Sequence, residues 1–132
     1  MKIVIDSYAW IELFIGSTKG HEVKKILESA DEVYTPDTAL AEIARKYIRE
    51  GVDDKTVKER LEQIIDASNI TYLDAKLALE SAKCYMELGE SAQKTKLDMP
   101  SLFDAIMLAT SRSLKAKILT GDEHFRLLPE TL

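Results

Sequence analysis

Residues 2–6 read KIVID, a lysine, three β-branched apolar residues and an acid. Residues 117–122 read KILTGD and give a similar pattern near the other end of the sequence. An apolar run without polar alternation is typical of a strand buried on both faces, as in a parallel sheet. In open α/β sheets, ligands bind outside the carboxyl ends of the strands. We therefore expect Asp6 and Asp122 to face one crevice.

The residues between these two strands alternate between helical and extended patterns. Helices are expected around residues 8–15, 23–30, 38–50, 54–65, 75–89 and 101–114. Further strands are expected at residues 32–35 and 69–73, and a mobile loop at 90–100. Asp37 or Thr38 is expected to cap the third helix, and Gly89 to end the fifth. The alternation indicates parallel βαβ units packed as an α/β sandwich.

The composition is that of a globular protein. With 132 residues, 45% of them hydrophobic, residues 1–132 are expected to form a single domain with a substantial core. No run approaches the ~18 apolar residues of a membrane span, and the N-terminal apolar run is too short for a signal peptide. Cys84 is the only cysteine, which excludes an internal disulfide and a cysteine-based zinc site. A cytoplasmic protein is expected.

The net charge of −5 argues against a broadly basic nucleic-acid binder. This objection weakens if divalent cations occupy an acidic site, because two such ions would bring the charge from −5 to −1. The densest basic patch on a predicted helix consists of Arg45, Lys46 and Arg49. These three residues are candidate RNA contacts, and a solvated helix face is an equally good explanation of them.

Four acids carry the functional prediction: Asp6, Glu42, Asp104 and Asp122. Clustered carboxylates repel and raise one another's pKa unless a cation joins them. An all-oxygen cluster suits Mg²⁺ or Mn²⁺, which is usually held by a few carboxylates, water and a substrate phosphate. The four acids therefore favour metal-dependent phosphodiester chemistry.

Each acid also has a structural explanation. Asp6 could cap the helix that begins near residue 8. Residues 101–104 match a capping box with Asp104 in its last position, and Asp122 follows a glycine, as turn residues often do. Glu42 lies nearly opposite the apolar face of its helix, where a solvated glutamate is usual. Capping by Asp6 or Asp104 remains compatible with metal binding.

Other phosphate-handling folds fit less well. The sequence contains neither a dinucleotide-binding Gly-x-Gly-x-x-Gly nor a P-loop. Asp6 is followed by Ser7 and Tyr8 rather than by a second acid two positions on, which disfavours an aspartyl-phosphate phosphatase. A response-regulator receiver is matched only in part, by Asp74 after the third predicted strand.

Four short motifs, in order along nearly the whole chain, resemble those of the PIN-domain ribonucleases, most closely the VapC-type toxins of prokaryotic toxin–antitoxin pairs. IVIDSYAW at residues 3–10 resembles the opening strand with its first acid and a following hydroxyl residue. The AEI at residues 41–43 is similar to the helix that brings the second acid. SLFDAI at 101–106 and ILTGDEHF at 118–125 match the third and fourth acidic motifs. Individually these motifs are short, but four in order are specific.

The resemblance implies a three-layer α/β/α domain with a short central parallel sheet, whose four acids gather around Mg²⁺ or Mn²⁺. It implies hydrolysis of RNA phosphodiester bonds by a metal-activated water. Asp6 and Asp104 are expected to bind the metal, Glu42 and Asp122 to bind directly or through water, and Ser7 and Thr120 to orient these carboxylates. An antitoxin protein is the expected partner. The alternative is a catalytically silent module of this fold that binds RNA or a protein.

The first predicted helix is apolar on nearly every side. The sheet can cover only part of such a helix, which would leave Trp10, Leu13 or Phe14 facing outward. Tryptophan and phenylalanine are enriched at the centres of protein interfaces. We therefore expect a homodimer, as is common among the toxins that the chain resembles. Burial of the whole helix by the next two helices is the alternative.

Overall fold

The computed structural model describes residues 1–120 and 128–132. Within them, four parallel strands form one sheet in the order β3-β2-β1-β4. The strands are β1 (Lys2–Ile5), β2 (Glu32–Pro36), β3 (Asn69–Thr71) and β4 (Lys117–Leu119). The helices are α1 (Ser7–Ile15), α2 (Thr18–Ser29), α3 (Asp37–Arg49), α4 (Asp54–Ala67), α5 (Ala75–Thr95) and α6 (Leu102–Leu114). This is the three-layer α/β/α fold, with a short central parallel sheet, that the family resemblance predicted.

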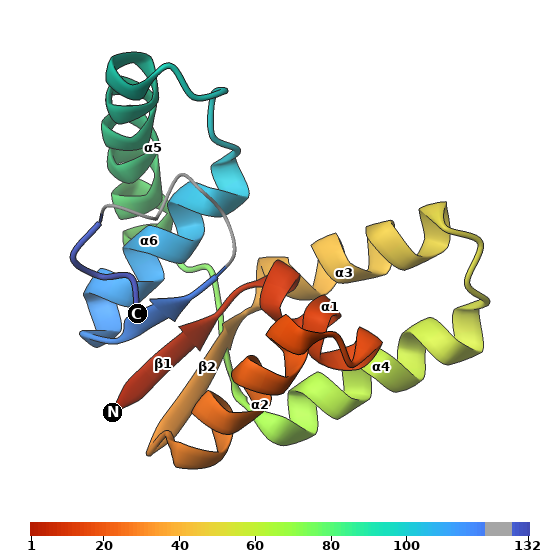
Figure 1. Ribbon diagram of the computed structural model, residues 1–132. Coiled ribbons are helices and arrows are strands. Elements are labelled where there is room, and N and C mark those ends of the chain that lie inside the picture. The colour runs from red at the N-terminus through yellow and green to blue at the C-terminus, as the bar shows by residue number, and fades with distance from the viewer. Residues whose placement is uncertain (121–127) are drawn as a thin grey trace.

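Strands β1 and β4 pack both of their faces against helices, as their apolar runs predicted. In β1, Val4 packs with α5 and α6, whereas the next residue, Ile5, packs with residues of α1 to α4. In β4, Ile118 packs with α5 and α6, and Leu119 packs with residues of α1 to α4. Successive side chains of a strand point to opposite faces, so the sheet separates two helical layers. Figure 1 shows α5 and α6 on one side and α1 to α4 on the other.

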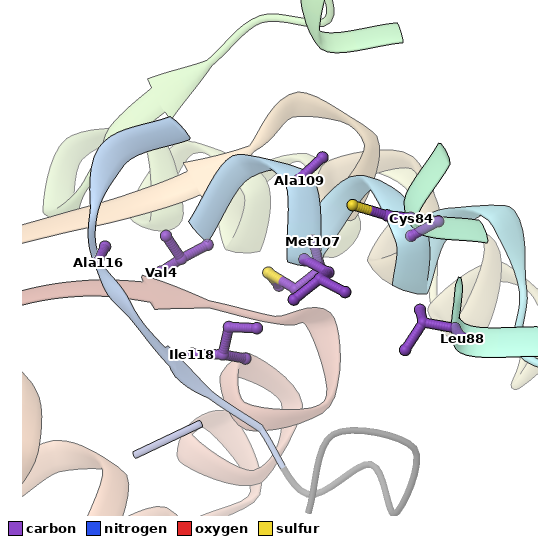
Figure 2. Packing of buried hydrophobic residues seen from close by; sticks show 9 residues of the cluster. Val4, Cys84, Leu88, Met107, Ala109, Ala116 and Ile118 are labelled. Atoms are coloured by element: carbon purple, nitrogen blue, oxygen red, sulfur yellow. The ribbon is translucent and has the colours of Figure 1, made fainter. Parts of the chain in front are cut away.

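The core beneath α5 and α6 is shown in Figure 2. Val4 and Ile118 of the sheet meet Met107 and Leu108 of α6, and Cys84 and Leu88 of α5 close the cluster from outside. Cys84 is a buried free cysteine that packs as a small apolar side chain. This cluster joins the beginning of the chain to its last helix and strand, and so fixes α6 against the carboxyl end of β1.

The predicted caps of α1 and α6 are confirmed. Asp6 caps α1, and Gly16 ends it in the left-handed conformation with φ 74°. Ser101 and Asp104 form the reciprocal capping box at the start of α6. The cap predicted for α3 is wrong, because Pro36 occupies the N-cap position and makes no side-chain hydrogen bond there. Proline's fixed φ suits the first turn of a helix, so the helix begins there without a polar cap.

The predicted end of α5 at Gly89 is also wrong. The helix continues to Thr95 and ends at Lys96, which takes the left-handed conformation with φ 58°. Gly89 is buried, and a Cβ at this position would lie 3.2 Å from the terminal methyl of Met99. The glycine thus makes room for the segment that returns from α5 to α6. The first part of the mobile loop expected at residues 90–100 is therefore helical, because α5 extends to Thr95.

Trp10 does not face outward, contrary to prediction. Its side chain is 2% exposed, and its indole Nε1–H donates to Thr35 Oγ1 at 3.1 Å. Leu13 and Phe14 are half-buried against the same core, and Phe14 stacks on the Trp10 ring with centroids 6.1 Å apart. The large apolar residue of α1 that remains most exposed is Ile15, at 66%.

Residues 128–132 lie along β4. The N–H of Ile118 donates to the carbonyl of Glu130 at 2.8 Å, and the N–H of Leu132 donates to the carbonyl of Ile118 at 2.9 Å. Arg112 of α6 holds Glu130 and also forms a bidentate pair with Glu87 of α5. These contacts tie residues 128–132 to the α5–α6 layer. None of the helices in the described ranges is long and apolar enough to span a membrane.

Candidate active site

Asp6 follows the central strand β1 and begins helix α1. Its Oδ1 accepts a hydrogen bond from the Ala9 amide at 2.8 Å, and its Oδ2 accepts one from the hydroxyl of Thr120, which follows the neighbouring strand β4. The residue is 8% exposed. Two strands that are far apart in the sequence thus hold one carboxylate in place at the carboxyl edge of the sheet.

Asp104 reaches the same region from the N-terminal turn of α6. Its Oδ2 accepts from the Ser101 amide at 2.9 Å, and its own amide donates to Ser101 Oγ at 3.2 Å. A carboxylate at this position is also favoured by the positive end of the helix dipole. The capping box therefore fixes the carboxylate of Asp104 rather than competing with a role in a site.

Glu42 is the third acid, brought in by α3. Burial raises its pKa most, and the negative charges of Asp104 and then of Asp6 raise it further, to about 7. Arg45 and a hydrogen bond from Ser7 act in the opposite direction and favour the charged form. The solvated position that the helical pattern suggested is wrong, because the side chain lies partly buried and close to the other two acids.

The three carboxylates line one pocket of about 160 Å³. The other residues in its wall are Ser7, Tyr8, Phe103 and Met107. The structure therefore brings together three of the four acids on which the sequence prediction rests. Asp122, the fourth, lies outside the described residues.

The donor set of this pocket suits a hard divalent cation. Its carboxylates are all oxygen donors, and the pKa of Glu42 is raised first by burial and then by the negative charges of Asp104 and Asp6. Among residues 1–120 and 128–132, no three acidic, histidine or cysteine side chains form a ready metal site. Water and substrate oxygens would have to complete the coordination, as is usual for Mg²⁺.

Ser7 and Thr120 contact acids of the pocket, because Ser7 hydrogen-bonds Glu42 and Thr120 hydrogen-bonds Asp6.

The three basic residues of α3 are placed differently. Arg45 lies over the ring of Phe103, with its guanidinium carbon 5.8 Å from the centroid. Lys46 pairs with Glu50 at 2.8 Å, and Arg49 is exposed in the last turn of the helix. Of the three, Arg45 has the contact with a residue of the pocket.

Two aromatic residues of the pocket were not among the predicted site residues. Tyr8 lies two positions after Asp6, and Phe103 directly precedes Asp104. Each has a cation near its ring, Lys19 for Tyr8 and Arg45 for Phe103. Their proximity in sequence to an acid was the available signal. An aromatic residue beside a strand end is more often part of a core, which is why the pattern did not single them out.

The comparisons with known proteins agree with this fold. The family model of the PIN domain matches residues 3–130. Among solved structures, a toxin–antitoxin complex from Klebsiella pneumoniae superposes with a TM-score of 0.70 at 21% identity, covering 98% of this chain and 95% of that chain. VapC20 of Mycobacterium tuberculosis, described as a sarcin–ricin loop cleaving toxin, gives 0.67 at 17% identity over 91% of each chain. VapBC2 of Rickettsia felis, bound to promoter DNA, gives 0.69 at 12% identity over 100% and 96%. No curated protein sequence matches the chain.

Proposed function

This chain belongs to the PIN domain family, and from that premise we propose that it is a metal-dependent endoribonuclease and the toxin of a toxin–antitoxin pair. The observation that carries the proposal is the pocket at the carboxyl edge of the sheet, where Asp6, Glu42 and Asp104 meet. Several solved structures of this fold are toxins or toxin–antitoxin complexes, which supports the proposed class of activity.

In this proposal, Asp6 and Asp104 hold Mg²⁺ or Mn²⁺, with Glu42 and Asp122 binding directly or through water. When bound, the cation polarises a phosphoryl oxygen and lowers the pKa of a water molecule. Thr120 and the Ala9 amide keep both oxygens of Asp6 oriented, and the capping box orients Asp104 through its Oδ2. Fixed carboxylates of this kind reduce the reorganisation needed during the reaction.

The protonation of Glu42 is coupled to the cation. Without a cation its pKa lies near 7, and a cation bound at the acids would favour the charged form. Ser7 donates a hydrogen bond to its charged form. In this proposal Glu42 releases its proton as the cation binds, and its carboxylate then takes part in holding the cation.

The proposed activity is tested with purified protein and total RNA, in the presence of Mg²⁺ and in the presence of chelator. We expect cleavage with Mg²⁺ and none with chelator. Asp6→Asn and Asp104→Asn should each abolish cleavage without unfolding the protein, because the substitutions keep the size of the side chain. Asp66→Asn, at an exposed position on α4, is the matched control and should cleave like the wild type. Full activity in either site variant would refute the assignment, and RNA binding without any cleavage would support the silent binding module instead.

We also propose an antitoxin partner and a homodimer. Ile15 at the end of α1 is an exposed apolar residue available for such contacts, and the structural neighbours include toxin–antitoxin complexes. Light scattering of the protein alone, and with the product of a neighbouring antitoxin gene, measures both associations. A strict monomer at high concentration that does not bind the neighbour would contradict this part of the proposal.

A further inference from the structure

A second hollow of about 190 Å³ adjoins the acid pocket. Tyr8 lies in the wall of both, and Thr120, whose hydroxyl binds Asp6, lies in the wall of the second. Tyr8 is thus the residue that the two linings share. The second hollow is formed by residues of α1 and α2 together with the end of β4 and Leu132.

The ring of Tyr8 is not used by the core. The residue is 42% exposed, in contrast to Trp10 two residues further along the same helix, which is 2% exposed. The ammonium of Lys19 lies 5.2 Å from the ring centroid, within the range of a cation–π contact. Lys19 is itself exposed and has a long side chain that can change its position over the ring of Tyr8.

The lining of the second hollow is partly apolar and partly charged. Val23, Ile26 and Leu119 supply the apolar surface, and Glu12, Glu22 and Lys19 supply the charges. A nucleobase has the matching chemistry, because its faces are flat and apolar while its edges form hydrogen bonds. Proteins that bind single-stranded RNA commonly stack such bases on exposed aromatic rings beside cationic residues.

We propose that this second hollow binds the nucleobase adjacent to the phosphodiester held at the acids, with Tyr8 as its stacking surface and Lys19 as a contact for the neighbouring phosphate. The inference rests on the proposed function, because it takes the acid pocket as the place where RNA is cut. It assigns to Tyr8 and Lys19 the positioning of the strand, and it leaves the chemical step to the acids.

The first test measures the affinity for a labelled single-stranded RNA oligonucleotide in an Asp104→Asn background, which separates binding from cleavage. Tyr8→Phe keeps the ring and should bind like its parent. Tyr8→Leu removes the ring and should weaken binding about tenfold. Tyr72→Leu is the matched control, because Tyr72 is a 75% exposed tyrosine that does not line either hollow, and it should have no effect.

A second test asks whether the lost affinity belongs to a base. A series of oligonucleotides, each lacking one base, should contain one that binds the parent about tenfold more weakly than the intact strand. In Tyr8→Leu, removal of that same base should not weaken RNA binding further, because the ring on which the base stacks is already absent. Additive losses, or equal binding by Tyr8→Leu and Tyr8→Phe, would overturn the proposal.

Lys19 is tested through the salt dependence of the same affinity. Lys19→Gln should reduce the slope of log K against log salt concentration by about 0.7, the value for one phosphate contact on a single strand. Lys24→Gln, on the same helix but outside this hollow, should leave the slope unchanged. If Tyr8→Leu weakens only antitoxin binding and not RNA binding, the surface serves a protein and the proposal fails. A wild-type protein that binds RNA through Tyr8 but does not cut it would refute the proposed function and leave this subsite standing.

Discussion

Glu42 is partly buried in the pocket, where its charged carboxylate is less well solvated than in water. Burial and the carboxylates of Asp104 and Asp6 all raise its pKa, to about 7, whereas Arg45 and Ser7 only partly oppose them. The charged form is therefore destabilised in the folded protein relative to the unfolded chain, in which the pKa is near 4.5. A carboxyl group retained under these conditions is typical of a functional site.

A pH dependence of stability follows in metal-free protein. Below about pH 4.5, Glu42 is protonated in both states and contributes no penalty. Between about pH 4.5 and 7 the unfolded chain has released this proton while the native state still holds it, so the free energy of unfolding falls by up to ~3 kcal/mol, at 1.36 kcal/mol per pKa unit, and stays lower above pH 7. Glu42→Gln should remove this loss.

Thermal melts in chelator at several pH values measure the effect. We expect Glu42→Gln to melt higher than the wild type at pH 8 and at nearly the same temperature at pH 4.5. Glu59→Gln, at an exposed position on α4, controls for loss of a surface charge. A difference between Glu42→Gln and the wild type that does not change with pH would rule out this explanation.

At the scale of residues, the sequence identified the acids, but it did not predict how the structure places all of them relative to one another. Asp6 and Asp104 lie next to strand-end and cap signals, so their placement followed from local rules. Glu42 could be picked out only through the family resemblance, because the helical pattern of α3 places it on the polar side. The burial of Trp10 depends on Thr35, a partner 25 positions away that no local pattern indicates.

At the scale of elements, the contact between α1 and α2 depends on the absence of a side chain at Gly20. A Cβ at this position would lie 2.1 Å from the carbonyl oxygen of Glu12 and 3.1 Å from Leu13 Cα. Both atoms belong to backbone and cannot rotate away. The close approach allows α2 to lie against α1 and to present Lys19 beside Tyr8.

Gly20→Ala should therefore lower the free energy of unfolding by at least ~2 kcal/mol, the cost of an overpacked contact. Gly16→Ala is the comparison, because Gly16 has nothing within 4 Å of a Cβ and only its φ of 74° opposes the substitution. That strain costs ~1 kcal/mol. Urea denaturation of both variants measures the difference, and equal losses would show that the helices can shift apart.

Element boundaries were predictable where a local signal and the packing agree. The ends of α1 and the start of α6 are such cases. Gly89 shows the opposite case, since the same residue type that ends α1 is used inside α5 for close packing against Met99. A glycine in the sequence permits either use, and only the tertiary contact decides between them.

At the scale of the whole molecule, a cation in the acid pocket should stabilise the fold. Mg²⁺ or Mn²⁺ that binds only the native state adds RT ln(1 + [L]/Kd) to the free energy of unfolding. At one hundred times the Kd this amounts to about 2.7 kcal/mol. The increase in Tm should be larger at pH 8 than at pH 5.5, because Glu42 must lose its proton to join the site.

Differential scanning fluorimetry with Mg²⁺, Mn²⁺ and chelator tests this linkage without measuring activity. The double variant Asp6→Asn/Asp104→Asn should show no metal-dependent shift. Identical melting curves of the wild type in chelator and in millimolar Mg²⁺ would remove the basis for a metal site.

The position of β1 between β2 and β4 has a consequence for the timing of synthesis. β1 is made first, yet Ile3 pairs with Val33 on one side and with Lys117 on the other. At roughly 5–20 residues per second, a ribosome needs on the order of ten seconds to pass from Asp6 to Thr120. Throughout that interval the edge of β1 that pairs with β4 has no partner strand. The hydroxyl of Thr120, which binds Asp6, has not yet been synthesised. The active site proposed here is thus completed only after β4 and Thr120 have been synthesised.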